Sequence, residues 1–192
     1  MVKKGNEFLE LLTILIENKE DFFSIKKLSE IRKINYKSAY EALKKLEKEG
    51  IIDLKKIGNT ISCSFNNKFN TTVFIAEHER RAKLLKKSDF RIIFNRLNEL
   101  KFPFIVLLFG SQVKNKQTKH SDFDLLIISH DEEEIKRVFL TLPLKTHLTY
   151  LTPKEFVSMT KSKEFSVVSE VMKKNIILIG IEDYYRLINN VK

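Results

Sequence analysis

The stretch FIVLLFGSQVKNKQTKHSDFDLLIIS, residues 104–129, decides how the second half of this 192-residue chain folds. An apolar run (104–109) ends at a Gly110-Ser111 pair, and a second apolar run (125–128) follows an Asp-x-Asp motif at 122–124. Both runs are short and rich in branched residues, which is typical of buried β-strands. The stretch therefore predicts two strands joined by a polar loop that carries several lysines.

Asp122 and Asp124 stand one residue apart at the start of the second predicted strand. Because alternate residues of a strand point to the same face, the two carboxylates are expected side by side, with Phe123 turned into the core. Oxygen ligands of this kind suit Mg²⁺, which also takes substrate phosphates as ligands. Gly110 lets the backbone approach a ligand, and Ser111 offers a hydroxyl and an N–H group at a predicted strand-to-helix turn. The pattern indicates a metal and phosphate site; the alternative is a β-hairpin with a chance pair of aspartates.

The order Gly110-Ser111, ten residues, then Asp122-Phe123-Asp124 resembles the DNA polymerase β-like nucleotidyltransferase superfamily. Its spacing is most similar to the minimal nucleotidyltransferases, which include antitoxins of prokaryotic toxin–antitoxin pairs. The resemblance implies transfer of a nucleoside monophosphate from Mg²⁺-ATP, or from another NTP, to a hydroxyl acceptor. It implies that Asp122 and Asp124 are catalytic and bind the metal, and that Gly110, Ser111 and Lys119 bind the nucleotide. In the antitoxin branch the acceptor is a partner toxin of the HEPN type, often a small helical ribonuclease. The alternative for Lys119 is a solvated loop, shared with Lys114 and Lys116.

The sequence departs from this family at one position. Active members usually carry a third carboxylate on a strand beside the Asp pair, but the matching predicted strand, THLTYL at 146–151, has none. Either the alignment is shifted, or another group such as His147 replaces the carboxylate, or the enzyme is weak or inactive. A histidine at the edge of the core is the plainer explanation of His147. The rival function is therefore a DNA-binding regulator whose nucleotidyltransferase-like domain only binds nucleotide or protein.

The amino-acid composition limits the cellular compartment and the kinds of binding partner that we expect for the protein. The chain is 43% hydrophobic, which is enough to bury a core, and its formal net charge is +10. Up to Lys87 there are 19 Lys and Arg against 12 Asp and Glu, so most of the excess lies in the N-terminal half and favours a polyanionic partner there. A lysine-rich proteome is the alternative. One cysteine, Cys63, excludes an internal disulfide, and no stretch approaches the ~20 apolar residues of a membrane span. We expect a cytoplasmic protein with no signal peptide and no membrane partner.

The N-terminal part has the periodicity of three helices and a β-hairpin. Helices are predicted at 6–18, 24–34 and 36–49, followed by strands at 51–54 and 60–65. Asn35 is the expected N-cap of the third helix, Gly50 its C′ residue, and Gly58-Asn59 a two-residue hairpin turn. Three helices followed by a hairpin is the order of a winged helix-turn-helix domain.

The segment from Ser24 to Phe65 resembles the winged helix-turn-helix family over its whole length. The resemblance implies that the third helix enters the major groove of duplex DNA and that the hairpin forms a wing. Solvated lysines, or a dimer or protein-binding module, are the alternatives, and homodimers are common among DNA-reading members. The expected DNA contacts are Lys37, Ser38, Tyr40, Lys44 and Lys45 on the third helix, and Lys55 and Lys56 near the hairpin tip.

The predicted order of helices and strands gives an α/β (α+β) protein of two domains. We expect the winged helix at 1–70, a linker helix or dimer contact at 71–87, and the nucleotidyltransferase domain with a mixed sheet at 88–192. Capping boxes are predicted at Ser129-x-x-Glu132 and at Thr152-x-x-Glu155, and a helix cap at Ser88-Asp89. Glu155 is thereby expected to be a cap rather than a catalyst.

Overall fold

The computed structural model describes residues 7–113, 122–162 and 166–189 of the chain. These fall into two compact units, Met1–Ala76 and Glu77–Lys192. The division lies within helix α4 (Thr71–Leu84), inside the segment predicted as a linker helix. No helix among the described residues is both long enough and apolar enough to cross a membrane.

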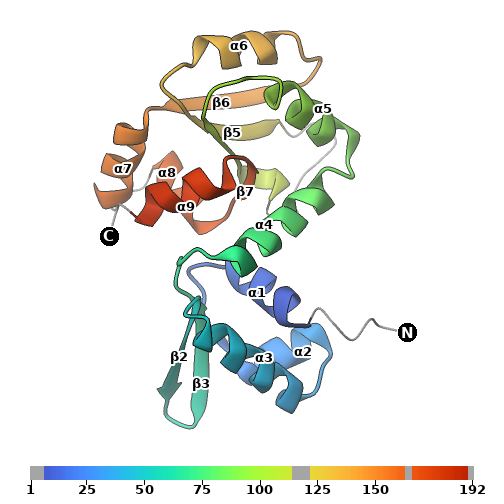
Figure 1. The fold of residues 1–192 in the computed structure, drawn as a ribbon, viewed down its shortest axis with the longest axis vertical. Helices are drawn as coiled ribbons and strands as arrows, with labels where there is room; N and C mark the ends of the chain where they lie inside the picture. Colours follow the sequence, from blue (N-terminus) through green and yellow to red (C-terminus); the bar gives the residue numbers. More distant parts are fainter. Residues whose placement is uncertain (1–6, 114–121, 163–165, 190–192) are drawn as a thin grey trace. The chain divides into compact units, whose positions relative to one another are not determined.

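The first unit contains three helices and a small antiparallel sheet (Figure 1). Its strand order is β1-β3-β2, and the two-residue strand β1 was not predicted. Leu11, Leu15, Leu43 and Leu46, from the first and third helices, are fully buried and form the centre of its core. The elements are α1 (Glu7–Glu17), β1 (Phe23–Ser24), α2 (Ile25–Arg32), α3 (Tyr36–Lys48), β2 (Ile52–Ile57) and β3 (Thr60–Phe65).

The second unit is built on a four-stranded mixed sheet of order β6-β5-β4-β7, which confirms the predicted mixed sheet. The β5–β6 pair is parallel, and the β4–β5 and β4–β7 pairs are antiparallel. One face packs against α5 and α6, and α7 and α9 contact the sheet as well (Figure 1). The elements after α4 are α5 (Ser88–Leu97), β4 (Ile105–Leu108), the short 3₁₀ helix η1 (Gly110–Gln112), β5 (Phe123–Ile128), α6 (Glu133–Leu140), β6 (Thr146–Leu151), α7 (Pro153–Ser162), α8 (Val167–Lys173), β7 (Ile176–Ile179) and α9 (Ile181–Asn189).

Side-chain caps fix several of these helix ends. The Asn35 side chain accepts a hydrogen bond from the Ser38 N–H at 2.8 Å, as predicted for the N-cap of α3. Thr152 and Glu155 form the predicted capping box, with the Thr152 N–H donating to Glu155 Oε2 at 2.7 Å and the Glu155 N–H donating to Thr152 Oγ1 at 3.2 Å. These bonds to the charged form hold the pKa of Glu155 below its ordinary value. The Glu155 carboxylate therefore serves as the helix cap of α7, as predicted.

Two of the predicted caps are wrong. The Ser129 hydroxyl accepts a bond from the Asp131 N–H at 3.0 Å, which makes a local turn, and α6 begins only at Glu133 without a side-chain cap. Likewise, the N-cap residue of α5 is Lys87, and Ser88 is already helical. The Ser129 hydroxyl is engaged in this local turn, whereas the Ser88 hydroxyl donates to the Asp89 carboxylate.

A buried polar network holds the C-terminal half of α4 within the second unit. Glu77 and Arg80 are 1% and 3% exposed and form an ion pair at 2.5 Å. The Tyr185 hydroxyl of α9 donates to Glu77 Oε1 at 2.8 Å, and Arg80 donates to the Asn175 carbonyl at 2.6 Å. This part of the predicted linker is thus a packed element of the second unit.

Candidate active site at the β4–β5 edge

The Gly110-Ser111 pair and the Asp-x-Asp motif meet at one edge of the mixed sheet. Leu108 pairs with Leu125 across the antiparallel β4–β5 ladder, and the Phe109 N–H continues it by donating to the Asp124 carbonyl at 3.1 Å. The chain then turns at Gly110, whose φ of +72° lies in the left-handed region. A Cβ atom on Gly110 would lie only 2.1 Å from Asp124 Oδ2. Glycine is therefore required here both for its backbone conformation and for the space that it leaves beside a carboxylate.

The two aspartates occupy unequal positions. Asp124 lies within β5, and its side chain is 27% exposed, with one oxygen against Gly110. Asp122 precedes the first residue of β5 and is exposed. Phe123 between them packs into the core, edge-on to the ring of Phe90 at 5.0 Å between centroids. As predicted, Phe123 is turned into the core, and Asp124, the next residue of the strand, faces the opposite side of the sheet.

The strand beside β5 places a histidine next to Asp124. In the parallel β5–β6 ladder Asp124 is the register partner of His147. The distance from His147 Nδ1 to Asp124 Oδ1 is 3.4 Å, and the His147 side chain is 68% exposed. Strand β6, Thr146–Leu151, is thus the neighbour that the sequence predicted, and it carries no carboxylate. The sequence leaves His147 as one alternative for the missing carboxylate beside the plainer histidine at the edge of the core, and its register with Asp124 follows only from the parallel pairing of β5 with β6.

The donor set of this edge fits a divalent cation that takes part of its shell from a substrate. Within the described residues, no group of three or more His, Cys, Asp or Glu is arranged to hold a metal ion. Mg²⁺ is usually held by one or two carboxylates together with substrate phosphates and waters, rather than by an all-protein cage. Asp122 and Asp124 are the residues that would hold it.

The remaining predicted nucleotide contacts lie on either side of η1. Ser111 is half-buried within η1, directly after Gly110. Lys119, with Lys114 and Lys116, lies outside the described residues. The edge described here therefore consists of Gly110, Ser111, Asp122, Asp124 and His147.

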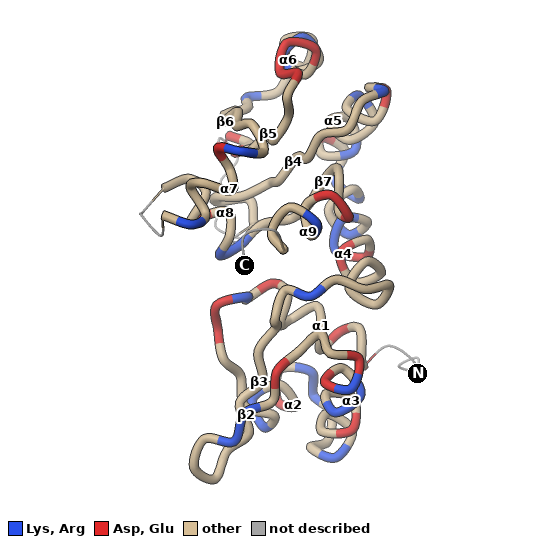
Figure 2. The backbone as a smooth tube through the Cα atoms, turned by 60° about the vertical axis from the view of Figure 1, so that its left-hand side comes forward, with Lys and Arg blue, Asp and Glu red and all other residues tan. Residues whose placement is uncertain are grey.

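The predicted DNA contacts lie on α3 and β2 of the first unit, where Figure 2 marks lysines. Several of the α3 side chains already have partners. Lys37 Nζ lies 3.9 Å from Glu41, Lys44 Nζ lies 2.8 Å from Glu47, and Lys45 Nζ lies 4.6 Å from the centre of the Phe8 ring. The hydrogen bond with the Glu47 carboxylate raises the pKa of Lys44 above its ordinary value.

The other predicted DNA contacts are Ser38 and Tyr40 on α3 and Lys55 and Lys56 on β2. The Tyr40 ring stacks on Tyr36 with 6.5 Å between centroids, and Ser38 is half-buried in the first turn of α3. Lys55 and Lys56 of β2 are both exposed beside the hairpin turn. Lys55 and Lys56 are thus exposed, whereas Lys37 and Lys44 lie beside carboxylates and Lys45 lies over an aromatic ring.

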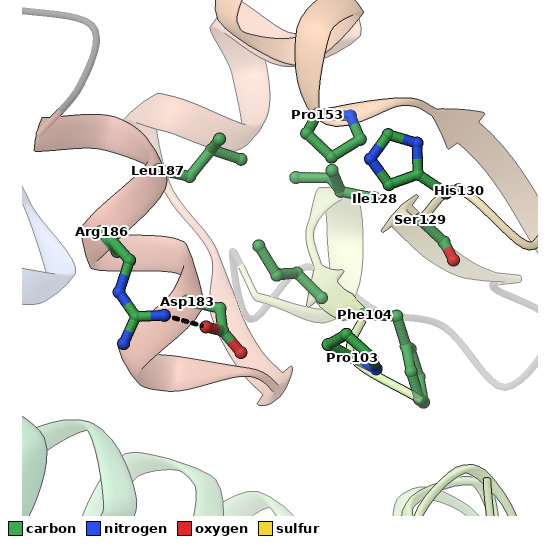
Figure 3. Close-up of a pocket in the computed structure, with 10 residues that line it drawn as sticks. Pro103, Phe104, Ile128, Ser129, His130, Pro153, Asp183, Arg186 and Leu187 are labelled. Atoms are coloured by element: carbon green, nitrogen blue, oxygen red, sulfur yellow. Dashed lines mark hydrogen bonds and ion pairs between the residues drawn. The ribbon is translucent and has the colours of Figure 1, made fainter. Parts of the chain in front are cut away.

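A cavity of about 220 Å³ lies at the opposite end of the strands (Figure 3). It is open to the start of β4 at Ile105 and the end of β5 at Ile128, whereas the Gly110 edge lies at the other ends of these strands. A six-residue strand such as β5 spans roughly 20 Å. The cavity is therefore separate from the Gly110–Asp124 edge. Its other lining residues are Pro103, Phe104, Ser129, His130, Pro153, Asp183, Arg186 and Leu187, and Asp183 and Arg186 form an ion pair at 2.9 Å.

An adjoining, more polar hollow shares Ser129 and His130 with that cavity and reaches Tyr150. Burial raises the pKa of Tyr150 to about 12, and Lys136 Nζ lies 5.2 Å from the centre of its ring. Neither hollow was predicted from the sequence. Their walls come from four separate segments of the chain, and no local motif brings such segments together.

Comparison with known proteins gives one family match, and it lies within the second unit. Residues 91–184 match the model of the family described as "Polymerase beta, Nucleotidyltransferase". The matched range contains Gly110, Ser111, Asp122, Asp124 and His147. No curated protein and no solved structure matches the chain. The family match supports a polymerase β-like nucleotidyltransferase domain, a class that typically uses a divalent metal with an NTP.

Proposed function

Taking residues 91–184 as a polymerase β-like nucleotidyltransferase domain, we propose that the protein transfers a nucleoside monophosphate from Mg²⁺-bound ATP, or another NTP, to a hydroxyl acceptor. The observation that carries this proposal is the approach of Gly110 to Asp124, where a Cβ would lie 2.1 Å from the carboxylate oxygen. Open backbone beside a fixed carboxylate is the combination that lets a phosphate and its metal occupy one site.

The proposed roles follow from the positions of the side chains. Asp124 is held by the β4–β5 ladder and by its contact with Gly110, so its carboxylate keeps one orientation. Asp122 supplies a second, exposed carboxylate from the residue before β5. Ser111 would donate its hydroxyl or N–H to a phosphate oxygen. A bound divalent ion supplies charge neutralisation and polarises the phosphoryl group that is attacked.

We propose a protein hydroxyl as the acceptor, and a partner toxin of the HEPN type as its source. This rests on the spacing of the Gly-Ser and Asp-x-Asp motifs, ten residues apart as in the minimal nucleotidyltransferases. The rival proposal is a regulator that binds nucleotide without transferring it, and it is favoured by the absence of a carboxylate on β6.

The first experiment separates these proposals. Millimolar Mg²⁺-ATP should raise the melting temperature of the protein, because a ligand that prefers the native state stabilises it. The double variant Asp122→Asn, Asp124→Asn should lose this gain. Labelled ATP should then transfer its nucleotide to the protein encoded by a neighbouring gene, and the double variant should transfer none. Binding without labelling would support the regulator, and no melting shift would refute the nucleotide site.

We propose further that the first unit is a winged helix-turn-helix domain that binds duplex DNA. The support is its element order, three helices and a hairpin with the strand order β1-β3-β2, and the exposed pair Lys55 and Lys56 beside the hairpin turn. In this arrangement α3 would lie in the major groove and the hairpin against the phosphates.

The DNA proposal has a matched control within the chain. The variant Lys55→Ala, Lys56→Ala should bind duplex DNA more weakly and with a shallower salt dependence, because each lost phosphate contact removes about one released counterion. Lys101→Ala, Lys154→Ala removes the same charge from exposed positions of the second unit and should leave binding unchanged. Full-length protein that shifts no duplex in a gel at low salt would refute the proposal.

We also propose that the protein forms a homodimer, since DNA-reading winged helices often pair to meet two half-sites. Sedimentation at high protein concentration tests this directly, and a monomer there would refute it.

A further inference from the structure

Two side chains of types that can bind metals, Asp124 on β5 and His147 on β6, face each other beside Gly110. Asp124 and His147 are register partners of a parallel ladder, so their side chains leave the same face of the sheet. Asp124 Oδ1 and His147 Nδ1 are 3.4 Å apart. Adjacent donors around one ion bound at 2.0–2.2 Å are separated by about 3.0–3.4 Å. The pair is therefore already spaced as neighbouring ligands.

The surroundings leave the imidazole available to an ion. The His147 side chain is 68% exposed, while Asp124 is 27% exposed and fixed against Gly110. Because His147 belongs to a regular strand, β6, its backbone position is fixed by the ladder rather than by a loop. The carboxylate is thus the less exposed group of the pair, and the imidazole is the more exposed one.

A nitrogen donor changes which ions such a site prefers. Mg²⁺ takes oxygen ligands in near-ideal octahedral geometry, whereas imidazole suits first-row transition ions. A site with only Asp122 and Asp124 offers oxygens alone, and a site that includes His147 does not.

We propose that His147 is a ligand of the nucleotide-bound metal, and that its nitrogen donor raises the affinity of this site for first-row transition ions, Mn²⁺ included, relative to Mg²⁺. The inference rests on the proposed nucleotide site and concerns the identity of the ion there. Asp124 and His147 would supply two protein donors, and the phosphates of the nucleotide would supply further ligands.

Metal preference is measured on the full-length protein with α,β-methylene-ATP, which is not cleaved at the reacting bond. Mn²⁺ binding is followed by the loss of the free-ion signal in electron paramagnetic resonance, and Mg²⁺ binding by competition. We expect His147→Ala to weaken Mn²⁺ binding by at least about tenfold. Mg²⁺ binding should weaken much less, because its oxygen ligands remain. His147→Glu, which exchanges the nitrogen for oxygens, should shift the preference towards Mg²⁺.

His130→Ala is the matched control, because His130 is an exposed histidine of the same unit that lines the cavity at the far ends of β4 and β5. It should leave both affinities unchanged. A second readout reports the bond directly: the spin-echo modulation of a ¹⁴N nucleus bound to Mn²⁺ should appear in the wild type and be absent in His147→Ala.

The outcomes separate this inference from the proposed function. If the wild type binds both ions with nucleotide but shows no bound nitrogen, and His147→Ala leaves the ratio of affinities unchanged, His147 is only a charge partner of Asp124 and the inference is overturned. If the wild type binds neither ion with nucleotide, the nucleotide site itself is refuted.

Discussion

Replacing Gly110 by alanine tests the geometry on which the candidate site depends. Gly110 has a φ of +72°, where an L-residue costs roughly 1–2 kcal/mol. The new Cβ would also lie 2.1 Å from Asp124 Oδ2 and 3.0 Å from its Cγ, so the carboxylate must rotate away. We expect a loss of more than about 1–2 kcal/mol in stability around β4 and β5, because the clash adds to the backbone cost, together with the loss of metal-dependent nucleotide binding.

Gly50→Ala is the matched control for the free-energy cost of placing an L-residue at a positive φ. Its φ of +73° is nearly the same, but no atom lies within 4 Å of the added Cβ. Peptide-resolved hydrogen exchange measures the stability that Gly50→Ala loses in the first unit and that Gly110→Ala loses in the second. Thermal melting with Mg²⁺-ATP measures nucleotide binding. At a nucleotide concentration 100 times Kd the wild type and Gly50→Ala should gain about 2.7 kcal/mol. Gly110→Ala should gain almost nothing. If Gly110→Ala kept the full gain, the carboxylate orientation set by Gly110 would be irrelevant to binding, and the reasoning would fail.

Three further predictions concern the core, the lone thiol and the turn after Gly110. Glu77→Ala should lower the free energy of unfolding by about 3–5 kcal/mol, because it removes the carboxylate paired with buried Arg80, and Tyr185→Phe should cost less; denaturant titration measures both. Burial raises the pKa of Cys63 to about 12, so the native thiol should resist a disulfide reagent at pH 8 until denaturant is added. The Cys63 thiol of the unfolded chain loses its proton near a pKa of about 8.5, whereas the folded chain keeps it up to about pH 12. The free energy of unfolding should therefore fall as the pH rises from about 8.5 towards 12. Ser111→Ala should weaken Mg²⁺-ATP binding by only about 0.5–1.5 kcal/mol, the net worth of one hydrogen bond, as titration calorimetry would show.

Local signals in the sequence predicted much of the architecture. Strand β6 begins and ends at its predicted residues, and Asn35 and Thr152 cap helices as expected. Such features depend on neighbours within four residues, so periodicity and capping chemistry suffice to find them. Strand β1 escaped prediction because two residues carry no periodicity, and its pairing is with Cys63, some 40 residues away.

The candidate site was predictable only where its parts adjoin in sequence. The Gly-Ser and Asp-x-Asp motifs each end or open an apolar run, so a hairpin-like pairing that brings them to one edge could be expected. The contact between Asp124 and His147 depends on the parallel pairing of β5 with β6 in one particular register. A slip of one residue would turn His147 to the other face, and no local pattern fixes that register.

The same edge explains why one motif yields two carboxylates of different character. Alternation places Asp122 and Asp124 on one face, but only Asp124 lies within the β5 ladder. Its carbonyl accepts from Phe109, its carboxylate contacts Gly110, and its register partner is His147. Asp122 stands one step outside that ladder and is exposed. In the proposed site Asp124 would therefore fix the position of the ion, whereas Asp122 would adjust to the ligands that a nucleotide brings.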